Sequence, residues 1–204
     1  MQHLDYLLAG ALGLALAACS GFRVFVPLLA ASLAYRTGYL TPASGFAWLG
    51  TWPAVAALGT ATVAEILGYY IPVVDNVLDT LTGPASFIAG TILMTSALPE
   101  LPPMLRWGLG ILVGGGTAGI IQTGTSLLRA GSTATTAGLG NPVLATLENL
   151  LAIVGSVLGL LVPVLVAALA LGTVVWMLSH LRRWRQRRAA RRQAHLASLR
   201  TTPS

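Results

Sequence analysis

The chain has 204 residues, of which 55% are hydrophobic and 9% are charged, whereas a soluble globular domain carries roughly 25% charged residues. This composition excludes a disordered chain and a soluble nucleic-acid-binding globule, and the single cysteine excludes a disulfide scaffold. The class that remains is a multi-pass, all-α membrane protein.

Apolar runs predict six membrane helices, because a helix needs about 20 apolar residues to cross the hydrocarbon core. The first run is too long for one simple crossing and holds Arg23 at its centre, so it is either strongly tilted or broken into two half-helices there. The last two runs have no polar linker, so the chain must turn near residues 155–159 or at Pro163. The expected spans are residues 6–35, 52–70, 84–98, 107–128, 142–158 and 161–178.

Positive charge is concentrated at the C-terminal end. Eight of the twelve arginines lie in residues 180–204, where there is no acid, and residues 1–179 carry a net charge of −2. Cytoplasmic flanks are enriched in Lys and Arg, so we expect a membrane domain over 1–179 and a basic cytoplasmic tail over 180–204. Six crossings then place the N-terminus in the cytoplasm as well. We expect the tail to attract anionic lipid headgroups and to have no specific nucleic-acid partner.

Leu16-Ala17-Ala18-Cys19 matches the lipobox of a lipoprotein signal. The five residues that open the chain hold no Lys or Arg, whereas such signals begin with positive charge. We therefore favour Cys19 as a small packing residue.

The two halves of the chain share a similar order of prolines, glutamates and apolar spans, which indicates an internal repeat. Trp52-Pro53 opens a span with Glu65, and Asn141-Pro142 opens a span with Glu148; a second proline and an apolar span follow each. Three spans per unit force the second copy to enter the membrane upside down, as in many secondary transporters. We therefore predict two inverted three-helix repeats, over about residues 6–98 and 107–178.

Three charged residues fall within the expected spans: Arg23, Glu65 and Glu148. An ionised group at the bilayer centre costs about 2.5–3.5 kcal/mol on insertion scales, so it needs a partner or water. Arg23 keeps its proton, and Glu65 is its expected partner because both belong to the first half. The charges either form a polar cavity for a substrate or ion, or fix helix register as buried pairs.

Asp75 and Asp79 are four residues apart and share a face if their segment is helical. They could hold a cation with water, balance the charge of Arg23, or form a solvated interfacial face. Two aspartates at this spacing are a signal of low specificity, so the sequence leaves these three alternatives open.

Small residues mark positions of close helix packing or of broken helices. A glycine run could unwind its helix and expose backbone groups to a ligand, although glycines at this spacing more often serve packing. The residues expected in these roles are Gly21, Gly114, Gly115, Gly116, Gly119, Asn141 and Pro142.

Enzyme and cofactor motifs are not indicated. The three histidines lie at the two ends of the chain, and there is no lysine for a phosphate-binding loop. We expect no catalytic residues, no metal site and no cofactor.

A set of short motifs is spread along most of the chain: Ser20-Gly21-Phe22-Arg23, Val26-Pro27-Leu28-Leu29, Glu65, Ile71-Pro72-Val73-Val74-Asp75, Asp79, and Gly138-Leu139-Gly140-Asn141-Pro142 before Glu148. Together these motifs resemble a bacterial membrane-protein family, domain of unknown function 4126, and the resemblance covers about residues 8–172. In that family a lysine commonly precedes the Ile-Pro pair and an acid often follows the glutamate, whereas this chain has Tyr70 and Asn149.

These observations predict a six-span inner-membrane transporter or channel for a small solute or ion, with a site at Arg23, Glu65, Asp75, Asp79 and Glu148. The alternative is a noncatalytic scaffold or lipid-binding protein in which the same charges are structural. The glycine faces would also permit a homo-oligomer.

Overall fold

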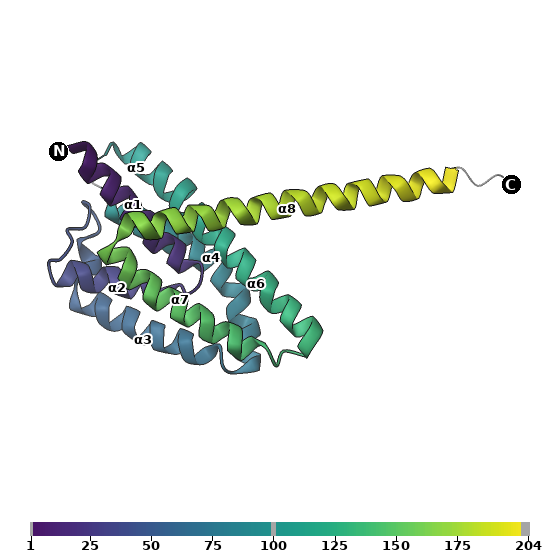
Figure 1. Ribbon diagram of the computed structural model, residues 1–204. Helices are drawn as coiled ribbons and strands as arrows, with labels where there is room; N and C mark the ends of the chain where they lie inside the picture. The colour runs from purple at the N-terminus through teal and green to yellow at the C-terminus, as the bar shows by residue number, and fades with distance from the viewer. Residues whose placement is uncertain (1, 99–100, 201–204) are drawn as a thin grey trace.

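The computed structural model describes the backbone of residues 2–98 and 101–200, while some side chains within α1, α4 and α8 lie outside its described part (Figure 1). Every regular element in these ranges is helical, which confirms the all-helical class. The helices are α1 (Gln2–Ser20), α2 (Phe25–Arg36), the short 3-10 helix η1 (Ala47–Gly50), α3 (Trp52–Gly68), α4 (Pro72–Ala97), α5 (Pro103–Leu109), the π-helix η2 (Gly110–Gly115), α6 (Gly116–Thr136), α7 (Asn141–Leu161) and α8 (Pro163–Arg200).

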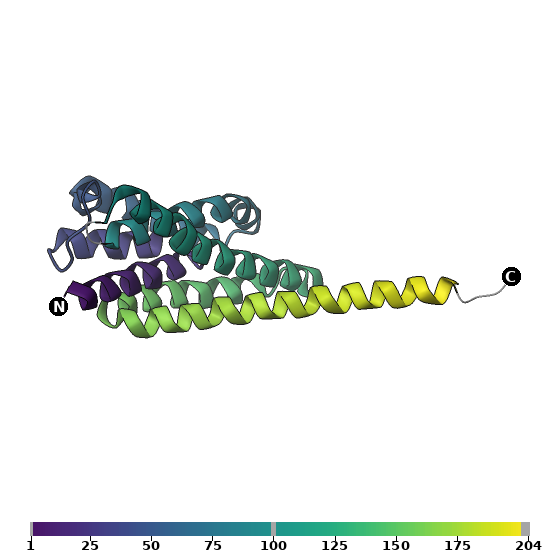
Figure 2. The same cartoon turned by 90° about the horizontal axis from the view of Figure 1, so that it is seen from above.

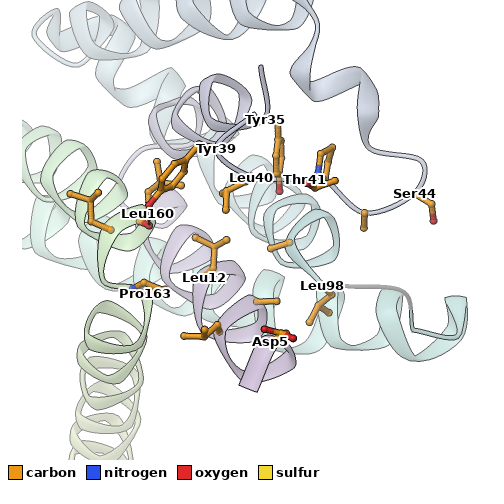
Figure 3. A pocket seen from close by; sticks show the side chains of 16 residues that line it. Asp5, Leu12, Tyr35, Tyr39, Leu40, Thr41, Ser44, Leu98, Leu160 and Pro163 are labelled. Carbon is orange, nitrogen blue, oxygen red and sulfur yellow. Dashed lines mark hydrogen bonds between the residues drawn. The ribbon is translucent and has the colours of Figure 1, made fainter. Parts of the chain in front are cut away.

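The first apolar run forms a helical hairpin. Its helices α1 and α2 are separated by a turn over residues 21–24, at the predicted break. Asp5, near the start of α1, and Tyr35, near the end of α2, line one pocket (Figure 3). The run therefore returns to the end of the molecule from which it began, and it does not cross the molecule as expected. Arg23 lies at the tip, deep inside the protein.

The α3–α4 pair also returns to this end, because Ala97 and Leu98 line the same pocket. Helix α4 begins at Pro72, not at Pro84 where we expected its span to start, and Pro84 lies inside the helix. An internal proline removes one backbone hydrogen bond, which neighbouring groups can replace in a packed helix.

One continuous helical rod runs from Pro103 to Thr136 through α5, η2 and α6. The glycine run does not unwind this rod, contrary to one alternative; it forms part of the π-helix instead. Gly114 lies against the backbone of Gly90 in α4, and Gly115 lies against Thr91 and Phe87. The packing alternative is confirmed at these two glycines.

Helices α7 and α8 meet at Val162, so the chain turns at Pro163 and not at residues 155–159. Helix α8 has 38 residues and runs well beyond the other helices (Figures 1 and 2). The start of α1 and the end of α8 therefore lie at opposite ends of the bundle.

Three helices are long and apolar enough to cross a membrane, within the described part of the chain: residues 103–136, 141–161 and 163–180. The side chains of Arg182 and Arg183 in the tail are exposed, and those of the other six tail arginines lie outside the described residues. The largest apolar core joins α1, α2 and α4 around Leu16, Leu28 and Leu93.

Candidate functional site

The tip of the α1–α2 hairpin is held by Glu65 of α3. Its two carboxylate oxygens accept hydrogen bonds from the backbone N–H groups of Val24, at 2.8 Å, and Phe25, at 3.0 Å. These donors are the N-cap residue and the first residue of α2, where the helix dipole favours negative charge. Glu65 is almost completely buried. It acts as an N-terminal cap supplied by another helix.

Replacing Glu65 tests this capping role. Glu65→Gln keeps one carbonyl oxygen but loses the charge and the second acceptor, so we expect a loss of about 1–2 kcal/mol in unfolding free energy, as for other helix caps. Glu65→Leu removes both acceptors, and we expect a larger loss. Thermal unfolding of the wild type and both variants in lipid nanodiscs measures whether stability falls in the order wild type, Glu65→Gln, Glu65→Leu. Equal stability of wild type and Glu65→Leu would contradict the capping role.

Arg23 is fully buried and bonds to helix α7. Its Nε donates to Asn149 Oδ1 at 2.5 Å, its Nη1 donates to Glu148 Oε2 at 3.0 Å, and its Nη2 donates to the carbonyl oxygen of Ala145 at 3.1 Å. Among the described side chains Arg23 forms an ion pair with Glu148, whereas Glu65 bonds to backbone groups, so the expected pairing of Arg23 with Glu65 is wrong. The partner lies 125 residues away in the sequence, in the second half of the chain.

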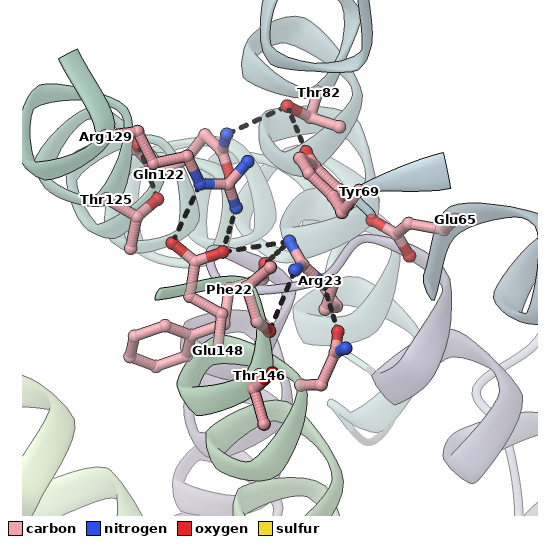
Figure 4. A network of polar contacts seen from close by, with 12 residues as sticks. Phe22, Arg23, Glu65, Tyr69, Thr82, Gln122, Thr125, Arg129, Thr146 and Glu148 are labelled. Atoms are coloured by element: carbon pink, nitrogen blue, oxygen red, sulfur yellow. Dashed lines mark hydrogen bonds and ion pairs between the residues drawn. The ribbon is translucent and has the colours of Figure 1, made fainter. Parts of the chain in front are cut away.

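Arg129 of α6 completes the cluster, and sequence reasoning missed it. Its Nε donates to Glu148 Oε1 at 3.2 Å, and its Nη2 contacts Glu148 Oε2. Both guanidiniums lie over the ring of Tyr69, with their carbon atoms 3.7 Å (Arg23) and 4.1 Å (Arg129) from its centroid. Figure 4 shows these four side chains together. Glu148 therefore pairs with two arginines that also contact one aromatic ring.

Neutral hydrogen-bonding groups extend the cluster toward α4 and α6. The Tyr69 hydroxyl donates to Thr82 Oγ1 at 3.2 Å, and Gln122 Nε2 donates to the same oxygen at 2.9 Å (Figure 4). Gln122 and Thr82 are buried. We define the Tyr69 cluster as Arg23, Tyr69, Arg129 and Glu148, with Thr82 and Gln122 as its neutral extension.

Tyr70 and Asn149, where the resemblance implies a lysine and an acid, are in contact. Asn149 Nδ2 donates to the Tyr70 hydroxyl at 3.3 Å, and that hydroxyl also bonds to Thr146 at 3.0 Å. A neutral hydrogen bond thus joins two positions that would otherwise carry opposite charges. Asn149 also accepts a hydrogen bond from Arg23. The Tyr70–Asn149 pair therefore links the exposed edge of α7 to the Tyr69 cluster.

The structure assigns different surroundings to the remaining predicted residues. Asp75 and Asp79 lie in the first turns of α4, but their side chains are outside the described part of the structure. Asn141 and Pro142 open α7, and Asn141 Nδ2 donates to Thr133 at 3.2 Å.

The predicted glycines serve packing where they have close neighbours. A Cβ on Gly21 would lie 2.7 Å from the carbonyl oxygen of Ala118, and one on Gly119 would lie 3.7 Å from Phe87. Gly116 has open space around it. Gly21 and Gly119 therefore lie at contacts between elements, whereas Gly116 does not.

A vestibule of about 480 Å³ leads to Arg129 from the end of the bundle at which α6 ends. It is rich in polar groups, since Thr80, Ser126, Thr133 and Asn141 line it with Arg129. At the other end, the buried side chains of Leu16 and Leu28 lie along the hairpin between its tip and the pocket at Tyr35. The cluster is therefore approached from one end and closed by apolar packing toward the other.

Metal ligands are not gathered among the side chains described, where no three of His, Cys, Asp and Glu come together. The chemistry available at the cluster is charge pairing, hydrogen bonding and cation–π contact.

Comparison with known proteins places the chain in a family. A family model described as "Domain of unknown function (DUF4126)" matches residues 11–183. Neither the curated proteins nor the solved structures contain a match. Because the matched range covers most of the chain, including all of the Tyr69 cluster, the protein belongs to the DUF4126 family.

Proposed function

We propose that the protein is a multi-pass membrane protein of the bacterial inner membrane. The three long apolar helices support this proposal, as do large apolar side chains on the outer surface, such as Leu112, Leu165 and Leu169. Each of these side chains is more than half exposed, and lipid would cover such a surface favourably.

We propose five crossings and one re-entrant hairpin in place of six crossings. The crossings are α3, α4, the α5–α6 rod, α7 and α8, and the hairpin is α1–α2. With the arginine-rich end of α8 in the cytoplasm, the start of α1 faces the other side of the membrane. Helix α2 runs opposite to α6, α3 opposite to α7, and α4 opposite to α8. These three opposed pairs support the inverted repeat in this modified form.

Within this framework the protein moves a small solute or ion across the membrane. The observation that carries the proposal is the position of Arg129, which lines the vestibule and also forms part of the buried Tyr69 cluster. Ionised groups at membrane depth are expensive and usually mark substrate or ion pathways. The vestibule gives access to these charges from the α6 end, and the apolar packing around Leu16 and Leu28 closes the path beyond. This arrangement suits a state open to one side.

A membrane scaffold is the second candidate, and the capping role of Glu65 favours it. Both oxygens of Glu65 bond to backbone groups, and Glu148 pairs with two arginines. Charges used in this way can hold helices in register without any transport.

Blocking the vestibule separates these two functions. Thr133 lines the vestibule, so we expect Thr133→Trp to reduce flux by about tenfold or more by filling the entry. Thr135 lies two residues further along the same helix, outside the lining, and is exposed. Thr135→Trp is therefore the matched control and should retain wild-type flux. The measurement is uptake of radioactive Na⁺, Rb⁺ and Cl⁻, and of protons by a pH-sensitive dye, into proteoliposomes.

The outcomes distinguish the candidates. Flux that Thr133→Trp abolishes and Thr135→Trp preserves supports transport through the vestibule. Flux that is equal in both variants excludes this vestibule as the path. If a folded wild-type protein moves none of these ions while Glu65→Leu unfolds, the scaffold is favoured.

A further inference from the structure

We propose that the pocket at the opposite end of the bundle binds an amphiphilic organic cation. This pocket lies between the start of α1, the segment that follows α2, the end of α4 and the α7–α8 turn (Figure 3). Its volume is about 820 Å³, which lies within the range of roughly 300–1,000 Å³ found for small-molecule sites. We call it the Asp5 pocket.

The chemistry of the lining selects the ligand class. Asp5 is the charged residue among the described lining side chains, and its carboxylate would attract a cation. Figure 3 shows Tyr35 and Tyr39 on one side of the pocket and Asp5 on the other, with Leu12 between them. A ligand with an ammonium group near Asp5 and an aromatic or alkyl body against Leu12 and the tyrosines would match this order of groups.

The walls of the Asp5 pocket are held in place before any ligand binds. The Tyr35 hydroxyl bonds to Ser96 Oγ at 3.0 Å, and the Tyr39 hydroxyl donates to the carbonyl oxygen of Leu160 at 3.4 Å. On the loop wall, buried Arg106 donates to both the hydroxyl and the carbonyl oxygen of Ser44, each at 3.2 Å. A preformed pocket loses less conformational freedom on binding, which favours affinity.

This site is separate from the proposed transport path. The vestibule at Arg129 and the Asp5 pocket share no lining residue, and the core around Leu16 and Leu28 lies between them. A binding defect at Asp5 therefore does not depend on whether the vestibule conducts. The two proposals can fail independently.

The probe is radiolabelled phenylbutyltrimethylammonium, which is permanently charged and carries one aromatic body. Binding is measured to the full chain in nanodiscs of a neutral glycolipid, with empty nanodiscs as the background. We expect the wild type to bind this cation at least about fivefold more tightly than phenylbutylsulfonate, its counterpart of opposite charge, because the lining carboxylate attracts one and repels the other.

Three variants locate the site. Asp5→Asn should weaken cation binding by about fivefold while leaving thermal stability unchanged, since Asp5 is exposed. Tyr39→Leu removes the ring and should weaken binding, whereas Tyr39→Phe keeps the ring, loses only the hydrogen bond to Leu160 and should weaken binding less. Trp176→Leu, an exposed aromatic on α8 outside the pocket, is the control and should bind like the wild type.

Two results would overturn the proposal: equal binding of the cation and the sulfonate, or unchanged cation binding in Asp5→Asn. The source of the ammonium group is tested by adding phosphatidylethanolamine to the nanodiscs. Competition by this lipid would support the site and assign it to a lipid headgroup, and absence of competition would support a soluble organic cation.

Discussion

Glu148→Gln is expected to lower the free energy of unfolding by about 3–5 kcal/mol, the cost of removing one partner from a buried ion pair. Glutamine has nearly the volume of glutamate, so the change removes charge and little packing. Arg23 and Arg129 would both lose their ion pair with Glu148 inside the protein. Thermal unfolding in nanodiscs, followed by tryptophan fluorescence, measures the loss.

Arg36→Gln is the matched control for this loss of an ionic contact. Arg36 is exposed at the end of α2, and its guanidinium lies 4.9 Å from the centre of the Trp52 ring. An exposed cation–π contact contributes about 0.5–1 kcal/mol, so the control should change stability little. If Glu148→Gln is no less stable than Arg36→Gln, then Glu148 does not hold the Tyr69 cluster together.

Much of the helical framework could be predicted from the chain, because proline and the length of apolar runs act locally. Pro53 and Pro142 lie in the first turns of α3 and α7, and Pro163 opens α8. Pro84 carried the same signal but lies inside α4, since packing against neighbouring helices can compensate for the lost hydrogen bond. The break near Arg23 was also visible. Whether it bends a crossing or makes a hairpin depends on contacts between distant helices.

The candidate site, like the framework, was predicted only in part. The cost of burying charge selected Arg23, Glu65 and Glu148, and all three are buried. Their pairing was wrong because proximity in sequence says little about partners 125 residues apart. Arg129 was missed because hydropathy ended the fourth span at Leu128, while α6 continues to Thr136.

Tyr69 illustrates a second limit of sequence reasoning. An aromatic residue at the end of an apolar run is typical of a membrane interface. Here Tyr69 is almost completely buried, and it accepts two guanidiniums on its ring. No sequence pattern brings Arg23 and Arg129 to one tyrosine ring, because the two arginines come together only when the helices are placed in space.

Gly114→Ala is expected to cost about 3 kcal/mol, at the upper end of the range for overpacking a core. The added Cβ would overlap the carbonyl oxygen of Gly90 and lie 2.5 Å from Cβ of Met94. A backbone carbonyl cannot rotate away as a long side chain can, so α4 and the π-helix would have to separate. The variant should therefore unfold at a lower temperature than the wild type in nanodiscs.

Gly116→Ala is the control, two residues along the same rod, where an added Cβ meets no atom within 4 Å. Alanine is the better helix former by about 0.8–1.0 kcal/mol, so this variant should be as stable as the wild type or more stable. The opposite signs of the two changes separate close packing from helix propensity. A loss of stability in Gly116→Ala equal to that in Gly114→Ala would mean that both glycines act through backbone flexibility, and the rods would then not depend on their contact at Gly90.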